Sequence, residues 1–247
     1  LYNAAHAAIA RLHTELAAHQ SLVSLDLEGK QTAMRRGVIN AELLWQARPA
    51  PTPENEAALR AGHGRVRLQA SAGLTPILAV ADTAAASSAD EHARYLGMLE
   101  LQAYTATASQ QERKSPLMAY GYSPDLRFLA LMPAPRLDFP QLLERVGASD
   151  TAGLISRLSY DLAVLKDPDA AALWASTRRI LWQAPAVNPL TGQNVIKLVE
   201  PAFDGLQPFM IFVSDYPVGA LAARLDAIPD GTAVALVDGD GRILLET

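Results

Sequence analysis

The sequence predicts an α/β fold of the α+β type, in which an antiparallel sheet has flanking helices and a long N-terminal helix. The helix is predicted because apolar residues recur at spacings of three, four and seven across residues 1–23. The sheet is predicted because residues 195–199 and 209–214 are rich in β-formers, and the second run alternates with period two. An Asp-Gly loop separates these two runs, so we expect an antiparallel hairpin at the centre of the sheet.

A second hairpin is expected earlier in the chain. Residues 117–122 and 127–132 have the composition of strands, and the Ser-Pro-Asp sequence between them is typical of a tight turn. Both hairpins have turn residues between their strands and apolar residues that alternate with period two, as strands of one sheet require. Residues 117–132, 195–202 and 208–215 are therefore predicted to share one antiparallel sheet.

Further helices are predicted from capping residues and apolar periodicity. Thr52, followed by Pro53, has N-cap chemistry for a short helix that ends at Gly62. Asp150 and Asp167 are N-cap candidates for two later helices. The other predicted helices span residues 31–46, 90–110, 142–146, 151–165, 168–182 and 218–228.

Residues 65–90 have an ambiguous pattern. Residues 65–69 alternate like a strand, whereas the alanine-rich residues 77–86 suit a helix. A helix is the preferred interpretation of this segment.

The composition excludes several classes of protein. The chain has 247 residues, enough for one large or two small domains. With 21 Lys and Arg against 26 Asp and Glu, it has a net charge of −5, which argues against nucleic acid or an anionic membrane as the main partner. There is no Cys, which rules out disulfides and thiolate metal sites. The chain begins with Leu1 and has no apolar run of about 20 residues, so we expect a segment excised from a longer protein.

Motifs for catalysis or for metal binding are missing from the sequence. No nucleophile elbow, HExxH motif, phosphate-binding loop or dinucleotide fingerprint occurs. The Asp238-Gly-Asp240-Gly sequence suggests calcium, but Arg242 and Ile243 occupy positions where an EF-hand loop needs a ligand and a glycine, so a hairpin turn is preferred. The acidic residues are expected at caps and turns. We predict no catalytic residue, no metal and no cofactor.

The second half of the chain resembles a known family of sensors. Trp182 closes the predicted helix 168–182, and the sequences NPLTGQ (188–193) and EPAFD (200–204) come next, before a strand that runs into Asp215. This series resembles the Cache fold, the PAS-like extracytoplasmic module of bacterial receptors. Residues 221–247 resemble the passage between the two modules of a double-Cache receptor. The resemblance covers residues 117–247.

The resemblance implies a domain organisation and a function. Residues 1–115 would form an N-terminal helical region that includes the long helix from the membrane. Residues 116–216 would be the membrane-distal module, and residues 217–247 a connecting helix and the opening hairpin of a second module. The implied function is extracytoplasmic ligand sensing for a bacterial membrane-bound receptor. A two-component sensor histidine kinase is the first choice of parent, with a chemoreceptor, a diguanylate cyclase or a free-standing periplasmic binding protein as alternatives.

Five polar or aromatic residues in the predicted strands or at the mouth of the sheet are the candidate ligand site: Tyr120, Tyr122, Trp182, Lys197 and Asp215. A Lys near an Asp would bind a zwitterionic metabolite such as an amino acid, or a carboxylate, and aromatic rings would exclude water. Each residue also has a structural interpretation. Lys197 suits the exposed charge of an edge strand, the two tyrosines suit a half-buried core, and Trp182 could simply pack against a helix end. A weak homodimer through residues 1–23 is expected in addition.

Overall fold

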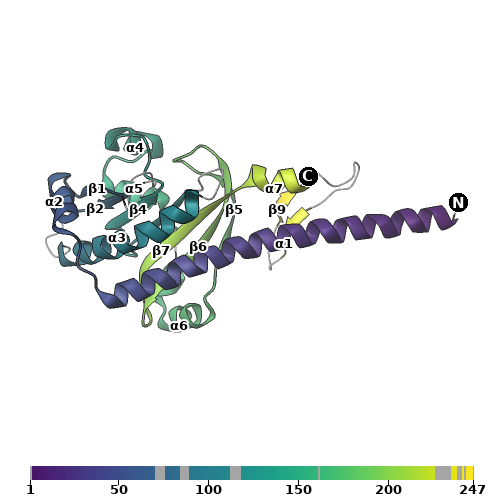
Figure 1. Ribbon diagram of the computed structural model, residues 1–247, viewed down its shortest axis with the longest axis horizontal. Coiled ribbons are helices and arrows are strands. Elements are labelled where there is room, and N and C mark those ends of the chain that lie inside the picture. Colours follow the sequence, from purple (N-terminus) through teal and green to yellow (C-terminus); the bar gives the residue numbers. More distant parts are fainter. Residues whose placement is uncertain are drawn as a thin grey trace.

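A seven-stranded antiparallel sheet in the order β1-β2-β4-β3-β7-β6-β5 forms the centre of the molecule (Figure 1). The structure is a computed structural model that describes residues 2–69, 76–83, 89–111, 118–160, 162–225, 235–237, 241 and 243–246. The strands of this sheet are β1 (Arg65–Leu68), β2 (Ile77–Ala81), β3 (Ala119–Tyr122), β4 (Phe128–Met132), β5 (Leu181–Val187), β6 (Asn194–Asp204) and β7 (Gln207–Pro217). The predicted fold class, an antiparallel sheet with flanking helices and a long N-terminal helix, is confirmed.

Helices cover both faces of the sheet. One face packs against α1 (Tyr2–Ala47), α2 (Pro53–Ala61) and α3 (Ala89–Gln111). The other packs against α4 (Phe139–Val146), α5 (Thr151–Leu158), the 3₁₀ helix η2 (Ala163–Lys166) and α6 (Pro168–Thr177). We call these the α1 face and the α5 face. Each face has its own apolar core, so residues that alternate along one strand belong to different cores.

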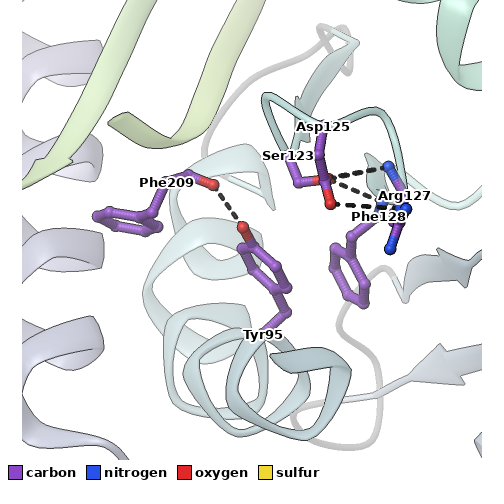
Figure 2. A network of polar contacts seen from close by, with 6 residues as sticks. All are labelled: Tyr95, Ser123, Asp125, Arg127, Phe128 and Phe209. Atoms are coloured by element: carbon purple, nitrogen blue, oxygen red, sulfur yellow. Dashed lines mark hydrogen bonds and ion pairs between the residues drawn. The ribbon is translucent and has the colours of Figure 1, made fainter. Parts of the chain in front are cut away.

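The two predicted hairpins lie in this sheet, as expected. β3 pairs with both β4 and β7, and Tyr120 lies opposite Val213 of β7. Figure 2 shows the turn between β3 and β4, where the Ser123 hydroxyl accepts hydrogen bonds from the backbone N–H groups of Arg127 and Phe128 at 3.0 and 2.9 Å. The same hydroxyl donates to Asp125 at 2.5 Å. The Ser-Pro-Asp sequence thus forms the predicted turn.

The prediction of a helix over residues 65–90 is wrong. Within this segment the structure has the antiparallel strands β1 and β2, and β2 also pairs with β4. All five residues of β2 are buried, because it lies between β1 and β4. The alanines that suggested a helix are small enough for this crowded position, and burial outweighs their helix propensity. The sheet therefore takes strands from both sides of the predicted boundary at residue 116. Residues 70–75 and 84–88 lie outside the described part.

The helix predicted over residues 168–182 also ends early. α6 stops at Thr177, and Arg178 adopts a left-handed conformation with φ of 52°. Leu181–Val187 then forms β5, whose first two residues had been predicted as the end of that helix. β5 is an edge strand with a shift of register after Gln183, and such a strand tolerates proline. Likewise, the helix predicted over 151–165 divides into α5 and η2.

One continuous helix replaces the two that were predicted near the N-terminus. α1 spans Tyr2–Ala47 without a break at residues 24–30, because a lone interior glycine such as Gly29 costs a helix only about 1 kcal/mol. Its C-terminal half packs on the sheet, and its first turns project beyond the rest of the molecule (Figure 1). No helix in the described residues is both long and apolar enough to cross a bilayer.

Buried ionic contacts hold α1 on the sheet. Glu42 accepts a hydrogen bond from the Phe203 N–H at 2.9 Å and forms an ion pair with Arg178 at 2.6 Å. Arg35 lies 3.8 Å from Glu200, and its guanidinium donates to the Arg178 carbonyl at 2.6 Å. Burial raises the pKa of Glu200 to about 7. The expectation that acidic residues serve caps and turns holds for Asp150 and Asp167. It does not hold for Glu42 and Glu200, which join α1 to β6.

Capping and the C-terminal segment follow the predictions where the structure describes them. Thr52, Asp150 and Asp167 each accept a backbone N–H at the start of a helix. α7 (Val218–Leu225) follows β7, and β8 (Ala235–Val237) pairs with β9 (Ile243–Glu246) in a separate two-stranded sheet. Asp238 and Asp240 of the predicted turn lie outside the described residues.

Candidate functional site

A cluster of buried polar side chains lies on the α5 face of the sheet. Lys197 of β6 is directly opposite Asp215 of β7, and residues opposite each other in an antiparallel pair point to the same face. Val199 lies opposite Val213, and Val213 lies opposite Tyr120, so Tyr120 shares this face. Lys197 and Asp215 are only 5% and 3% exposed. The strand register therefore brings together four of the five predicted site residues, Tyr120, Tyr122, Lys197 and Asp215.

Lys197 is held by tyrosines. Its ammonium donates a hydrogen bond to the Tyr120 hydroxyl at 3.2 Å, and that hydroxyl donates to the Leu158 carbonyl at 3.0 Å. The ammonium also lies 5.3 and 5.6 Å from the ring centroids of Tyr120 and Tyr160, within the range of cation–π attraction. β6 lies between β7 and β5, so the edge-strand interpretation of Lys197 is wrong.

Asp215 is held by the loop that follows β5. The side-chain amide of Asn188 donates to one carboxylate oxygen of Asp215, while the other, Oδ1, is buried without a hydrogen-bond partner among the described residues. Asn188 is itself fixed, because its side-chain oxygen accepts from the Leu190 N–H at 2.7 Å and its carbonyl accepts from the Gly192 N–H at 2.8 Å. The Asn-Pro-Leu-Thr-Gly turn thus places an amide against the carboxylate.

Tyr122 lies next to Tyr120, two residues further along β3 and on the same face of the sheet. Its hydroxyl accepts a hydrogen bond from the Tyr160 N–H at 2.9 Å. Tyr120 and Tyr122 therefore fasten the segment after α5 to the sheet, through Leu158 and Tyr160 respectively. That segment covers the cluster.

Burial controls the protonation of these groups. Burial raises the pKa of Asp215 from its ordinary 3.8 to about 6, although the charge of Lys197 and the Asn188 hydrogen bond act in the opposite direction. Burial likewise lowers the pKa of Lys197, with the Asp215 charge opposing the shift. The pKa of Tyr120 is raised well above its usual value by burial, so this hydroxyl stays protonated and serves as a hydrogen-bonding group.

Trp182 lies on the other face of the sheet. It is opposite Leu198 on β6, one residue away from Lys197, and it packs against the core that contains α1. Because successive side chains of a strand point to opposite faces, the sheet lies between Trp182 and the Lys197–Asp215 pair. The structure does not bring Trp182 together with the other four residues, because β5 begins at Leu181 and fixes this register.

Sequence reasoning missed Asn188 and Tyr160. In the sequence, Asn188 was considered only as the first residue of NPLTGQ. An asparagine has enough donors and acceptors both to complete a turn and to bind a carboxylate. Its 0% exposure was the feature that a sequence could not supply. Tyr160 follows the end of α5, which was predicted to continue to residue 165.

Comparisons with known proteins returned structural neighbours only. No family model matches the chain, and no curated protein matches it significantly. The ligand-binding domain of the Pseudomonas fluorescens chemoreceptor CtaA, in complex with L-isoleucine, matches with a TM-score of 0.32 and 20% identity over 52% of this chain and 44% of that one. The ligand-binding domain of the Pseudomonas aeruginosa PAO1 amino acid chemoreceptor PctB, in complex with L-Gln, has a TM-score of 0.32 and 20% identity over 56% and 50% of the two chains.

A third neighbour covers more of the chain. The sensory domain of the Campylobacter jejuni chemoreceptor Tlp3, with isoleucine bound, has a TM-score of 0.36 and 11% identity over 91% of this chain and 73% of that one. The chain spans about half the length of the Pseudomonas domains. All three neighbours are ligand-binding or sensory domains of chemoreceptors.

Proposed function

We propose that this chain is an extracytoplasmic ligand-sensing domain of a bacterial membrane-bound signal-transduction receptor, and that its ligand is a small zwitterionic or carboxylate metabolite. The observation on which this rests is the placement of Lys197 and Asp215 in the middle of an apolar sheet. Burial of two ionisable groups is costly, and an apolar pair of similar volume is often more stable. Buried ionisable groups with shifted pKa values, which lower stability, are concentrated at functional sites.

Each charged group of the pair has a neutral partner. The Lys197 ammonium donates to Tyr120, and Asp215 accepts from Asn188, which leaves Asp215 Oδ1 as a buried acceptor. We infer that this acceptor receives the ammonium of an amino acid and that Lys197 receives its carboxylate. Apolar walls with a few convergent polar groups are the common form of a small-molecule site. Residues 158–160, at the end of α5, must move to admit the ligand, because Leu158 and Tyr160 cover the cluster.

The parent protein is the finer part of the proposal. We take a two-component sensor histidine kinase in the inner membrane as the parent, with this domain in the periplasm, since the Cache resemblance implies that output most often. A chemoreceptor or a diguanylate cyclase would join the same sensor to another output, and a free-standing periplasmic binding protein would have none. The full-length gene distinguishes them, because a kinase, methyl-accepting or cyclase segment after a membrane span identifies the parent.

A melting screen with amino acids, organic acids and amines tests the proposed site. The panel includes L-isoleucine and L-glutamine, which are bound in two of the structures compared above. A ligand present at about 100 times its dissociation constant should stabilise the domain by about 2.7 kcal/mol. Lys197→Met and Asp215→Asn should each abolish that stabilisation, since each removes one half of the charge recognition.

Lys166→Met is the matched control for this screen, because Lys166 is an exposed lysine on η2 next to the same cover. It should keep the full shift. A ligand that still stabilises both Lys197→Met and Asp215→Asn binds elsewhere, and the assignment of the site would then be wrong.

The N-terminal half of α1 is proposed as a weak homodimer interface that transmits the signal. Leu22 and Leu25 are 55% and 69% exposed beside Val23, the first residue of α1 in the core, and an apolar helical stripe can pack against a symmetry mate. In the full-length receptor in membranes, cysteine at Leu22 or Leu25 should form intersubunit disulfides within minutes of mild oxidation. Cysteine at exposed Gln20, on the opposite side of the helix from both leucines, is a control for random collision. Equal cross-linking at all three positions would contradict an ordered interface.

A further inference from the structure

A cavity of about 170 Å³ lies on the α1 face, on the opposite side of the sheet from Lys197 and Asp215. α1 and α3 form one wall, and strands β2, β3, β4 and β7 form the other. The surface is mainly apolar. The residues used in the argument below are Ala33, Met34, Gly37, Gln102, Met132 and Phe212.

Small residues create this space. A Cβ atom added at Gly37 would meet nothing within 4 Å, so close packing does not explain a glycine in the interior of α1. Alanine would favour the helix, yet the chain has a glycine where the helix borders the cavity. Across the cavity, a Cβ at Gly121 would lie 3.0 Å from the Met210 sulfur and 3.3 Å from the Phe212 ring. A larger residue at either glycine would change the shape of the space.

The chemistry of the walls selects an aromatic occupant. Met34 and Met132 supply polarisable sulfur atoms, which contact aromatic rings favourably, and Phe212 supplies a ring for edge or offset stacking. The amide of Gln102 is also in the wall, oriented by its hydrogen bond to the Gly37 carbonyl at 3.2 Å. Apolar cavities of about 150 Å³ bind molecules of the size of benzene.

We propose that this cavity is a second ligand site, which binds a small monocyclic aromatic molecule with one hydrogen-bonding substituent. The ring lies among Met34, Met132 and Phe212, and the substituent faces the Gln102 amide. The occupant contacts α1, α3 and the sheet together, so it holds the long helix on the sheet more firmly. The site is independent of the one proposed on the α5 face and remains if that assignment fails.

Calorimetric titration and thermal melting with phenol and benzyl alcohol test this site, with cyclohexanol as the non-aromatic match for phenol. The aromatic probes should bind the wild type with a dissociation constant below about 1 mM and raise its melting temperature, and cyclohexanol should bind at least about tenfold more weakly. Gly37→Leu fills the cavity and should weaken phenol binding at least about tenfold.

Gly29→Leu is the matched control, because it makes the same change on the same helix at an exposed glycine with no neighbour within 4 Å. It should leave phenol binding unchanged. If Gly37→Leu does not fold, Ala33→Leu replaces it, since Ala33 is an exposed residue of the same wall. The proposal is wrong if neither aromatic probe binds the wild type, if cyclohexanol binds as tightly as phenol, or if the filled variant binds phenol like the wild type.

Discussion

Trp45→Ala should lower the free energy of unfolding by about 3–5 kcal/mol, the range for loss of a large buried aromatic side chain. Trp45 is 4% exposed and stacks on Phe209 of β7, with ring centroids 4.3 Å apart and planes 7° apart. It also contacts Tyr95 of α3, with ring centroids 4.7 Å apart. Truncation would therefore open a cavity where α1, α3 and the sheet meet.

Polar contacts add to this expected loss. The Arg94 guanidinium lies 3.7 Å from the centroid of the Trp45 ring, and the indole N–H donates to Asp204 at 3.1 Å. Figure 2 shows the adjoining contact, in which the Tyr95 hydroxyl donates to the Phe209 carbonyl at 2.5 Å. Because this hydroxyl satisfies a strand carbonyl, rearrangement of the aromatic cluster would disturb the sheet as well.

Chemical unfolding monitored by circular dichroism measures this effect. Leu43→Ala is the control, because Leu43 is 61% exposed two residues away on the same helix and its truncation should change stability by no more than about 0.5 kcal/mol. A loss below about 1.5 kcal/mol for Trp45→Ala would show that α1 contributes little to the core.

The sequence was most informative where local and tertiary preferences agreed. The β6–β7 hairpin has period-two faces, β-branched residues and a turn, and the structure pairs Val195 through Asp204 with Gln207 through Pro217. β2 was misassigned because its alanines favour a helix locally, and only the neighbouring strands β1 and β4 make a strand the better solution.

The candidate site shows a similar division between local and tertiary information. The sequence grouped Lys197, Asp215, Tyr120 and Tyr122 because they are polar or aromatic residues set in apolar strands. The register of β3, β7 and β6 puts all four on one face of the sheet. The face on which Trp182 lies depends on where α6 ends. α6 ends before Arg178, which adopts a left-handed conformation, and the sequence has no glycine or proline there to mark a helix terminus. Asn188 was missed because a turn sequence does not reveal that the turn is buried.

Lys197→Met should destabilise the domain by about 3–5 kcal/mol at pH 8, since removal of one partner leaves the other charge buried and uncompensated. The loss should be much smaller at pH 5. The folded-state pKa of Asp215 is raised from 3.8 to about 6, so the carboxyl is mostly protonated at pH 5. As the pH rises from about 4 to about 6, ionisation of this buried group lowers the free energy of unfolding. Lys197 opposes that shift. Without it the pKa of Asp215 rises further, and the window in which stability is lost extends above pH 6.

The double variant Lys197→Met/Asp215→Asn is the control for this prediction. Asparagine cannot ionise, so the double variant should recover most of the stability lost at pH 8 and show no extra dependence on pH. Glu200, whose pKa is raised to about 7, also titrates in this range, but it is present in all the variants and cancels from their differences. Urea unfolding of the wild type, the single variant and the double variant at pH 5 and pH 8 gives the six free energies of unfolding required. An equal loss of stability at the two pH values would contradict this prediction. It would mean that Lys197 stabilises the domain by packing alone, and that its charge does not offset the burial of the Asp215 carboxylate.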